Sequence, residues 1–139
     1  MLFRSVDRHR DSFRHLVRDL DYVIGNEHEW SSLYQTDLDT ALTQASRDAG
    51  LVVCTRSGDE VILMRGAERV VVPVQRVVPV DATGAGDLFA AGFIYGLATG
   101  QSLDIAGRMG CTAAAEVIGH YGARPESDLK TLFAARGLI

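Results

Sequence analysis

The chain has 139 residues, of which 47% are hydrophobic and 23% charged, and its formal net charge is −4. These values are typical of one soluble globular domain and exclude a disordered tail, a collagen-like repeat and a long coiled coil. The charge gives no reason to expect a nucleic-acid partner, and without eighteen consecutive apolar residues we expect no membrane-spanning helix.

Two further features bear on the cellular compartment. The first ten residues lack the apolar stretch of a secretory signal. The two cysteines, Cys54 and Cys111, lie far apart and show no metal-type spacing. We therefore expect a reduced, cytoplasmic setting, with Cys54 in a core strand and Cys111 in a core helix.

Helices alternate with a strand in the first fifty residues. Apolar spacing predicts a helix over residues 7–20, and a strand over residues 21–25 that ends in a loop at 26–29. A second helix begins at the capping pair Thr36 and Asp39 and stops at Gly50. The arginines of the first helix could suggest nucleic-acid or membrane binding, but neighbouring aspartates offset them, so a solvated helix face is the better interpretation.

The middle of the chain is rich in β-branched residues. Short apolar runs at residues 51–54, 61–64 and 70–74 are separated by turn residues and predict strands. A further apolar strand that includes residues 77–80 leads into the loop at 81–87. We expect an α/β fold in which buried parallel strands are joined by a hairpin.

Three helices follow that loop. The first carries an apolar stripe and closes at Gly100, the second runs from the cap Ser102 to about Ile118 with Gly119 as its stop, and Pro125 suits the first turn of the third. The stripe of the first helix is made of Leu88, Ala91, Tyr95 and Ala98, and the predicted inward-facing residues of the second are Ala106, Met109, Ala113 and Val117.

The most specific local feature is Gly84-Ala85-Gly86-Asp87, which opens a helix directly after an apolar segment. Glycines let backbone N–H groups approach a ligand closely, and a helix N-terminus favours an anion such as phosphate. A carboxylate beside a phosphate makes sense if Asp87 accepts a proton from a hydroxyl that attacks the phosphate. The alternative is an aspartate that only caps the helix.

Two known phosphate-binding loops do not fit this segment. A Walker A loop requires a lysine, and the only lysine is Lys130. A dinucleotide-binding loop requires glycine at position 89, where Phe89 stands, and the acid at a suitable distance, Asp104, falls between two predicted helices. Both are excluded.

Residues 81–93, Asp-Ala-Thr-Gly-Ala-Gly-Asp-Leu-Phe-Ala-Ala-Gly-Phe, closely resemble the C-terminal signature of the ribokinase-like (PfkB) carbohydrate and nucleoside kinases, from which Ala82 departs mildly. The resemblance implies a doubly wound, mostly parallel sheet with flanking helices and an ATP-dependent phosphotransferase. It also implies that Asp87 is the catalytic base, and that the backbone of Gly84, Ala85 and Gly86 forms an anion hole.

Two segments of the first half resemble the nucleotide side of the same family. Asn26 and Glu29 match its Asn-x-x-Glu motif, which helps position Mg²⁺, an ordered water and the phosphates. Residues 55–58, Thr-Arg-Ser-Gly, resemble its nucleotide-side turn and imply ATP contacts at Thr55, Ser57 and Gly58. Many members carry a glycine where this chain has Glu60. A polar loop and a simple hairpin turn are the respective alternatives.

Residues 119–124 resemble a loop that surrounds a monovalent cation such as K⁺ in relatives. The implied cation ligands are the Asp81 carboxylate and the backbone oxygens of Thr83, Val117, His120 and Gly122. In relatives the preceding helix flanks adenine, which implies contacts at Gly110 and Ala113. A helix C-cap and a small-residue packing face account for these positions equally well.

The resemblance begins near Val6 and covers only the C-terminal half of the family. We therefore expect residues 1–139 to be the C-terminal part of a single PfkB-type kinase domain, without the acceptor-binding and lid part, and with Met1 to Ser5 as an accidental start. The implied partners are ATP, a sugar or nucleoside acceptor, and either a second copy or the missing half.

The full-length reaction that the resemblance implies is transfer of the ATP γ-phosphate to a hydroxymethyl group. Motif spacing and residues 8–13 most resemble the bacterial adenosine-kinase-like branch. The alternative is a non-catalytic nucleotide- or phosphate-binding fragment, or a partner-binding module.

Overall fold

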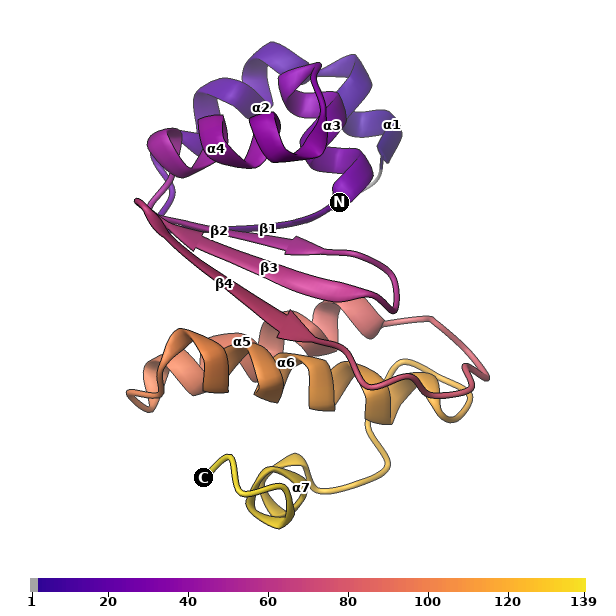
Figure 1. The fold of residues 1–139 in the computed structure, drawn as a ribbon. Coiled ribbons are helices and arrows are strands. Elements are labelled where there is room, and N and C mark those ends of the chain that lie inside the picture. The colour runs from indigo at the N-terminus through magenta and orange to yellow at the C-terminus, as the bar shows by residue number, and fades with distance from the viewer. Residues whose placement is uncertain (1–2) are drawn as a thin grey trace. The chain divides into compact units, whose positions relative to one another are not determined.

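The computed structural model describes residues 3–139 (Figure 1). Met1 and Leu2, part of the expected accidental start, lie outside the described residues. The elements within residues 3–139 are α1 (Phe3–Arg8), α2 (Arg10–Val17), β1 (Tyr22–Asn26), α3 (Glu27–Tyr34), α4 (Leu38–Asp48), β2 (Leu51–Thr55), β3 (Glu60–Arg65), β4 (Glu68–Pro73), α5 (Ala85–Ala98), α6 (Leu103–Ile118) and α7 (Leu129–Ala135).

The chain divides into two compact units, Met1–Val71 and Val72–Ile139, called here the N-terminal and C-terminal units. Together they have the α/β composition that the sequence predicts. Within residues 3–139 no helix combines the length and the apolar composition needed to cross a lipid bilayer.

The strands form one mixed sheet in the order β1-β2-β3-β4. β1 pairs parallel with β2, and β2 pairs antiparallel with β3, so the expected parallel strands and hairpin are both present. The prediction of a strand at residues 77–80 is wrong, because this stretch has no regular secondary structure. Pro79 has no N–H for a strand ladder, and the Val80 N–H donates instead to the carbonyl of Ile118 at 2.8 Å.

The core of the N-terminal unit lies between helices and one face of the strands. Figure 1 shows α1 to α4 grouped over that face, and apolar side chains from these helices pack against Val52, Cys54, Ile62 and Met64. Trp30 is 2% exposed, and its indole N–H donates to the Val53 carbonyl at 3.0 Å. That bond satisfies the polar end of an otherwise apolar side chain.

Three expectations for this unit are wrong. The helix predicted over residues 7–20 is two helices, α1 and α2, interrupted at His9. The loop predicted at 26–29 is the beginning of α3, whose buried Trp30, Leu33 and Tyr34 recur at helical spacing. α4 is capped by Asp37, which accepts from the Thr40 N–H at 2.9 Å, and not by the pair Thr36 and Asp39.

Close approach of backbones characterises the C-terminal unit. An added Cβ on Gly92 would lie 2.7 Å from the Met109 carbonyl oxygen, and one on Gly96 would lie 2.7 Å from Ala106 Cα. The most buried residues of α5 are therefore Phe89, Gly92, Phe93 and Gly96. Of the predicted stripe, Leu88 and Tyr95 pack against the buried cluster of α6 and α7, whereas Ala91 and Ala98 are exposed. The predicted face of α6 is confirmed, because Ala106, Met109, Ala113 and Val117 are all fully buried.

The ends of α6 and α7 follow local capping rules. Ser102 caps α6 and Gly119 ends it, as expected. α7 begins after Asp128, whose side chain accepts from the Thr131 N–H, so Pro125 precedes the helix and does not lie in its first turn. Phe133 of α7 packs with Met109 and Ala113 in one buried cluster.

Candidate functional site

The first predicted motif forms a capping box. Asn26 ends β1, and its side-chain oxygen accepts from the Glu29 N–H at 2.9 Å, while Glu29 Oε2 accepts from the Asn26 N–H at 2.9 Å. Glu29 is 4% exposed. The two bonds hold an amide and a carboxylate at the carboxyl end of a parallel strand, where α/β sheets bind ligands.

The second predicted motif lies beside the first. In the parallel register Asn26 is opposite Thr55, the last residue of β2. Ser57 and Gly58 follow with φ angles of +38° and +94°, and the Asp59 N–H donates to the Arg56 carbonyl at 2.9 Å to close the turn. The structure thus brings the two motifs that were predicted to bind nucleotide together within the N-terminal unit.

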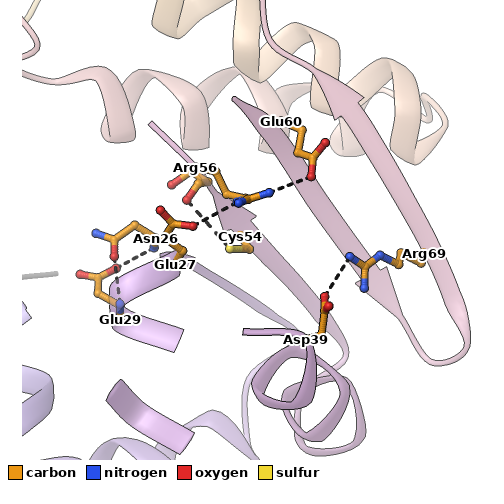
Figure 2. A network of polar contacts seen from close by, with 9 residues as sticks. Asn26, Glu27, Glu29, Asp39, Cys54, Arg56, Glu60 and Arg69 are labelled. Atoms are coloured by element: carbon orange, nitrogen blue, oxygen red, sulfur yellow. Dashed lines mark hydrogen bonds and ion pairs between the residues drawn. The ribbon is translucent and has the colours of Figure 1, made fainter. Parts of the chain in front are cut away.

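Arg56, inside the second motif, was not predicted as a site residue. Its Nε donates to Glu27 Oε2 at 3.1 Å and its Nη1 donates to Glu60 Oε1 at 2.8 Å (Figure 2). The bond with Glu27 is the main cause of a raised pKa at Arg56, so the guanidinium stays charged. No local sequence pattern indicated this contact, because Arg56 lies in a hairpin turn and Glu27 is far away along the chain.

Neither cysteine has the lowered pKa of a reactive thiol. Cys54 is buried, and burial raises the pKa of its thiol to about 12. Cys111 is half-buried in α6, and burial raises its pKa to about 11. At neutral pH both side chains therefore remain thiols, which are weaker nucleophiles and metal ligands than thiolates. Both residues contribute to packing.

The predicted anion hole lies at the start of α5 in the C-terminal unit. Gly84 precedes the helix with φ +82°, and a Cβ there would lie 2.8 Å from Ala123 Cβ. An added Cβ at Gly86 would meet nothing within 4 Å. The Ala85 N–H donates to the Ala82 carbonyl at 3.2 Å, whereas the N–H groups of Gly86 and Asp87 have no acceptor among residues 3–139.

Asp87 does not cap its helix. No side chain caps α5, and the exposed Asp87 carboxylate accepts no hydrogen bond from any residue that the structure describes. Ser102 and Asp128, by contrast, accept from backbone N–H groups at the starts of α6 and α7. The interpretation of Asp87 as a simple helix cap is therefore wrong, and its carboxylate is available to a ligand.

Asp81 ties the loop before α5 to the loop after α6. Its Oδ1 accepts from the Thr83 hydroxyl at 2.6 Å and from the Thr83 N–H at 2.9 Å, and its Oδ2 accepts from the Gly122 N–H at 3.1 Å. These bonds, the Thr83 hydroxyl first, lower the pKa of Asp81. Within residues 3–139 no donor reaches the carbonyls of Val117, His120 or Gly122, which leaves these oxygens open.

Glu116 is a second unpredicted residue of this region. Its carboxylate accepts from the N–H groups of Glu126 and Ser127, both at 2.9 Å, and lies 3.3 Å from His120 Nε2. Burial alone would raise the pKa of Glu116, but the hydrogen bonds outweigh burial and lower it. Glu116 thereby holds the loop that carries His120.

Gly110 and Ala113 lie in the interior of α6. A Cβ on Gly110 would lie 2.8 Å from the ring of Phe89, and Ala113 is fully buried. Packing of α5 on α6 is sufficient to account for both small residues. Their predicted contact with adenine stays a prediction.

The predicted site residues thus fall into two groups, one in each unit. A profile of the pfkB family carbohydrate kinases matches residues 2–130. The chain belongs to the PfkB family. Members of this family, which includes ribokinases and adenosine kinases, are phosphotransferases.

Curated relatives of this PfkB chain include sugar and nucleoside kinases. An uncharacterized sugar kinase of Archaeoglobus fulgidus is 34% identical over 111 residues, which cover 78% of the chain and 44% of that protein. A cytidine kinase of Thermococcus kodakarensis is 33% identical over 119 residues, covering 83% of the chain and 43% of that protein. The PfkB chain spans less than half the length of these relatives.

Solved structures confirm the ribokinase-like fold. A probable sugar kinase from Rhizobium etli matches with a TM-score of 0.95 and 41% identity, over 99% of the chain and 43% of that protein. The adenosine kinase from Sinorhizobium meliloti matches with a TM-score of 0.91 and 42% identity, over 99% of the chain and 42% of that protein.

Proposed function

We propose that this PfkB chain is the nucleotide-binding and proton-accepting part of a kinase that transfers the ATP γ-phosphate to a hydroxymethyl group of a sugar or nucleoside. The observation that carries the proposal is the start of α5. Two backbone N–H groups and one carboxylate there have no partner among residues 3–139. Phosphoryl transfer requires both donors for the phosphate and an acceptor for the hydroxyl proton.

The proposed roles follow from this geometry. The acceptor hydroxyl oxygen attacks the γ-phosphorus, the bond from that phosphorus to the bridging oxygen breaks, and the hydroxyl proton passes to the Asp87 carboxylate. The N–H groups of Gly86 and Asp87 donate to the oxygens of the transferred phosphate. Gly84 allows the tight turn that exposes these donors, and Ala85 lies between the two glycines with its N–H in that turn.

Asn26 and Glu29 fit a hydrated magnesium ion that accompanies ATP. No group of three or more His, Cys, Asp or Glu side chains in the described part of the chain could hold a metal by itself. Mg²⁺ usually binds through one or two carboxylates, several waters and substrate phosphates, which suits one amide and one carboxylate. When bound, the ion neutralises phosphate charge; Thr55, Ser57 and Gly58 would contact the nucleotide beside it.

We further propose a potassium site between the two loops that Asp81 joins. The lowered pKa of Asp81 keeps its carboxylate ionised, and the open carbonyls of Val117, His120 and Gly122 are hard oxygen ligands. The Thr83 carbonyl would complete the set. The site would link cation binding to the position of the α5 N-terminus.

The proposed acceptor is an adenosine-like nucleoside. The 42% identity with the adenosine kinase from Sinorhizobium meliloti supports it. We propose that acceptor-binding residues come from outside this chain, so the chain alone binds Mg·ATP weakly and turns over negligibly. The proposed setting is the cytoplasm, where ATP is present and free thiols stay reduced.

The test compares Asp87→Asn with the control Asp104→Asn, another first-turn aspartate, which pairs with Arg108 at 2.8 Å. Calorimetry with Mg·ATP should show about fivefold tighter binding for Asp87→Asn, since a like charge is removed from the phosphates. Asp104→Asn should match the wild type. No binding of Mg·ATP to folded wild-type chain would refute the nucleotide site.

The catalytic role needs an acceptor-binding half joined to the chain. In such a joined protein Asp87→Asn should lower kcat by about 10²- to 10⁴-fold, which is the contribution of a general base. Unchanged turnover would instead favour the non-catalytic binding fragment. Robust phosphorylation of adenosine or ribose by this chain alone would contradict the proposed division of the site.

A further inference from the structure

Arg56 bridges three elements at the edge of the N-terminal unit where both nucleotide-side motifs lie. The parallel register pairs Asn26 with Thr55, so the next residue of each segment, Glu27 and Arg56, meets the other. Arg56 Nε donates to Glu27 Oε2 at 3.1 Å, and across the hairpin its Nη1 donates to Glu60 Oε1 at 2.8 Å. Figure 2 shows this Glu27–Arg56–Glu60 bridge next to Asn26 and Glu29.

The bridge differs from an ordinary surface ion pair in the same unit. Among residues 3–139 the one ion pair of Arg69 is with Asp39, at 3.4 Å, and the Asp39 side chain is 80% exposed. The Arg56 side chain is 30% exposed and contacts two carboxylates on two different elements. A planar guanidinium fixes the relative geometry of two carboxylates in a way that one exposed pair does not.

The turn that Arg56 begins needs such support. Ser57 has φ +38°, in the left-handed region that residues other than glycine rarely adopt. Such a conformation persists only where the surrounding structure enforces it. The Asp59 N–H to Arg56 carbonyl bond and the bridge to Glu60 close the turn on both sides.

We propose that Arg56 is a positioning residue for the nucleotide, acting through the bridge and not by touching phosphate. The bridge holds the turn of Thr55, Ser57 and Gly58 in place against the start of α3, where Asn26 and Glu29 lie. Two carboxylates on one guanidinium leave the cluster with a net negative charge, which does not suit direct phosphate binding. The inference rests on the nucleotide site of the proposed function.

The experiment measures Mg·ATP affinity by calorimetry on the whole chain and its variants. Arg56→Ala should weaken binding about tenfold because the turn loses its preorganised position, with a melting temperature close to that of the wild type. Arg56→Lys should recover part of the loss, since an ammonium lacks the planar fork. Arg69→Ala is the matched control and should bind as the wild type does.

Glu60→Asp separates positioning from direct contact, because it keeps the negative charge but shortens the side chain that reaches Arg56 Nη1. Positioning predicts weaker Mg·ATP binding, because one arm of the bridge is lost. A direct Arg56–phosphate contact predicts tighter binding, because the guanidinium is released from a competing carboxylate at unchanged charge. Amide exchange at Asp59 should also become about tenfold faster in Arg56→Ala and stay unchanged in Arg69→Ala.

Each possible outcome either supports or overturns the positioning role of Arg56. Weaker binding in both Arg56→Ala and Glu60→Asp, at unchanged melting temperature, supports the inference. Equal affinities for Arg56→Ala and Arg69→Ala, tighter or unchanged binding in Glu60→Asp, or an affinity loss that only follows a lowered melting temperature overturns it and leaves the nucleotide site intact. A folded wild-type chain that does not bind Mg·ATP overturns both the inference and the proposed function.

Discussion

The two units fix their candidate site residues by different means. In the N-terminal unit polar side chains do so: the capping box of Asn26 and Glu29, and the bridge centred on Arg56. In the C-terminal unit small residues hold the backbone in place, because without a Cβ at Gly84 and Gly92 neighbouring backbone segments come into contact. The carboxylates of Asp81 and Glu116 add hydrogen bonds to loops of that unit.

The difference predicts how each unit tolerates change. A hydrogen bond is directional but can be replaced by another side chain of similar reach, at a net cost of about 1 kcal/mol. A backbone contact at van der Waals distance has no spare volume, so one added methyl group must displace main-chain atoms. The glycine contacts should therefore be the less tolerant of the two.

The strongest test of this contrast is Gly92→Ala. We expect the free energy of unfolding to fall by about 3 kcal/mol, because the new Cβ would lie 2.7 Å from the Met109 carbonyl oxygen and 3.0 Å from its carbon. Gly86→Ala in the same helix is the control for stability, since its Cβ enters open space. Urea unfolding measures both, and equal effects would contradict the role of backbone contact.

Trp30→Phe probes the N-terminal unit at its most buried polar bond. Loss of the bond to the Val53 carbonyl should lower the free energy of unfolding by about 2 kcal/mol. Tyr34→Phe is the comparison, because Tyr34 donates to the partly exposed Asp48 at 2.8 Å and should cost about 0.5 kcal/mol. If the two variants proved equally stable in denaturant, burial would not set the strength of these bonds.

Asn26→Ala tests the capping box, with an expected loss of about 1 kcal/mol. Asn26→Ser should keep most of the stability, because serine also accepts from the N–H of the third helical residue. Thermal unfolding of the two variants checks this. A harmless Asn26→Ala would mean that Asn26 does not stabilise α3.

The smallest expected effect concerns His120 in the C-terminal unit. Its contact with the Tyr121 carbonyl at 3.1 Å, followed by that with Glu116, raises the pKa of His120 above 6.5. The protonated ring is the form that the fold favours. The contacts of the protonated ring contribute fully to stability below pH 6.5. This contribution is lost as the pH rises through the raised pKa of His120 in the folded protein.

Denaturant midpoints measured from pH 6 upward should show this loss in the wild type. His120→Gln should flatten the curve over the same range, whereas His15→Gln, at an exposed position of α2, serves as a reference. A wild-type midpoint that rose with pH over this range and flattened in His120→Gln would reverse the assignment.

The sequence alone determined what depends on neighbours along the chain. Runs of β-branched residues predict β2 and β3. The cap Ser102, the stop Gly119 and an apolar stripe predict α6. Each of these signals depends on residues that are close together in the sequence. The family signature at residues 81–93 likewise needs only local order. Local order also accounts for a wrong prediction: a loop was expected at residues 26–29, although Asn26 and Glu29 have the spacing of the capping box that they form.

Only the tertiary structure decided which chain segments meet. The buried face of α5 depends on where Met109 and Gly110 of α6 lie, so a nearly uniformly apolar helix could not reveal it. Arg56 contacts Glu27 because two parallel strands end at the same edge, a pairing that no spacing along the chain records. Long-range contacts arise from packing and register, whereas capping and periodicity arise from adjacent residues, and that is why the helices and strands were predictable and their contacts were not.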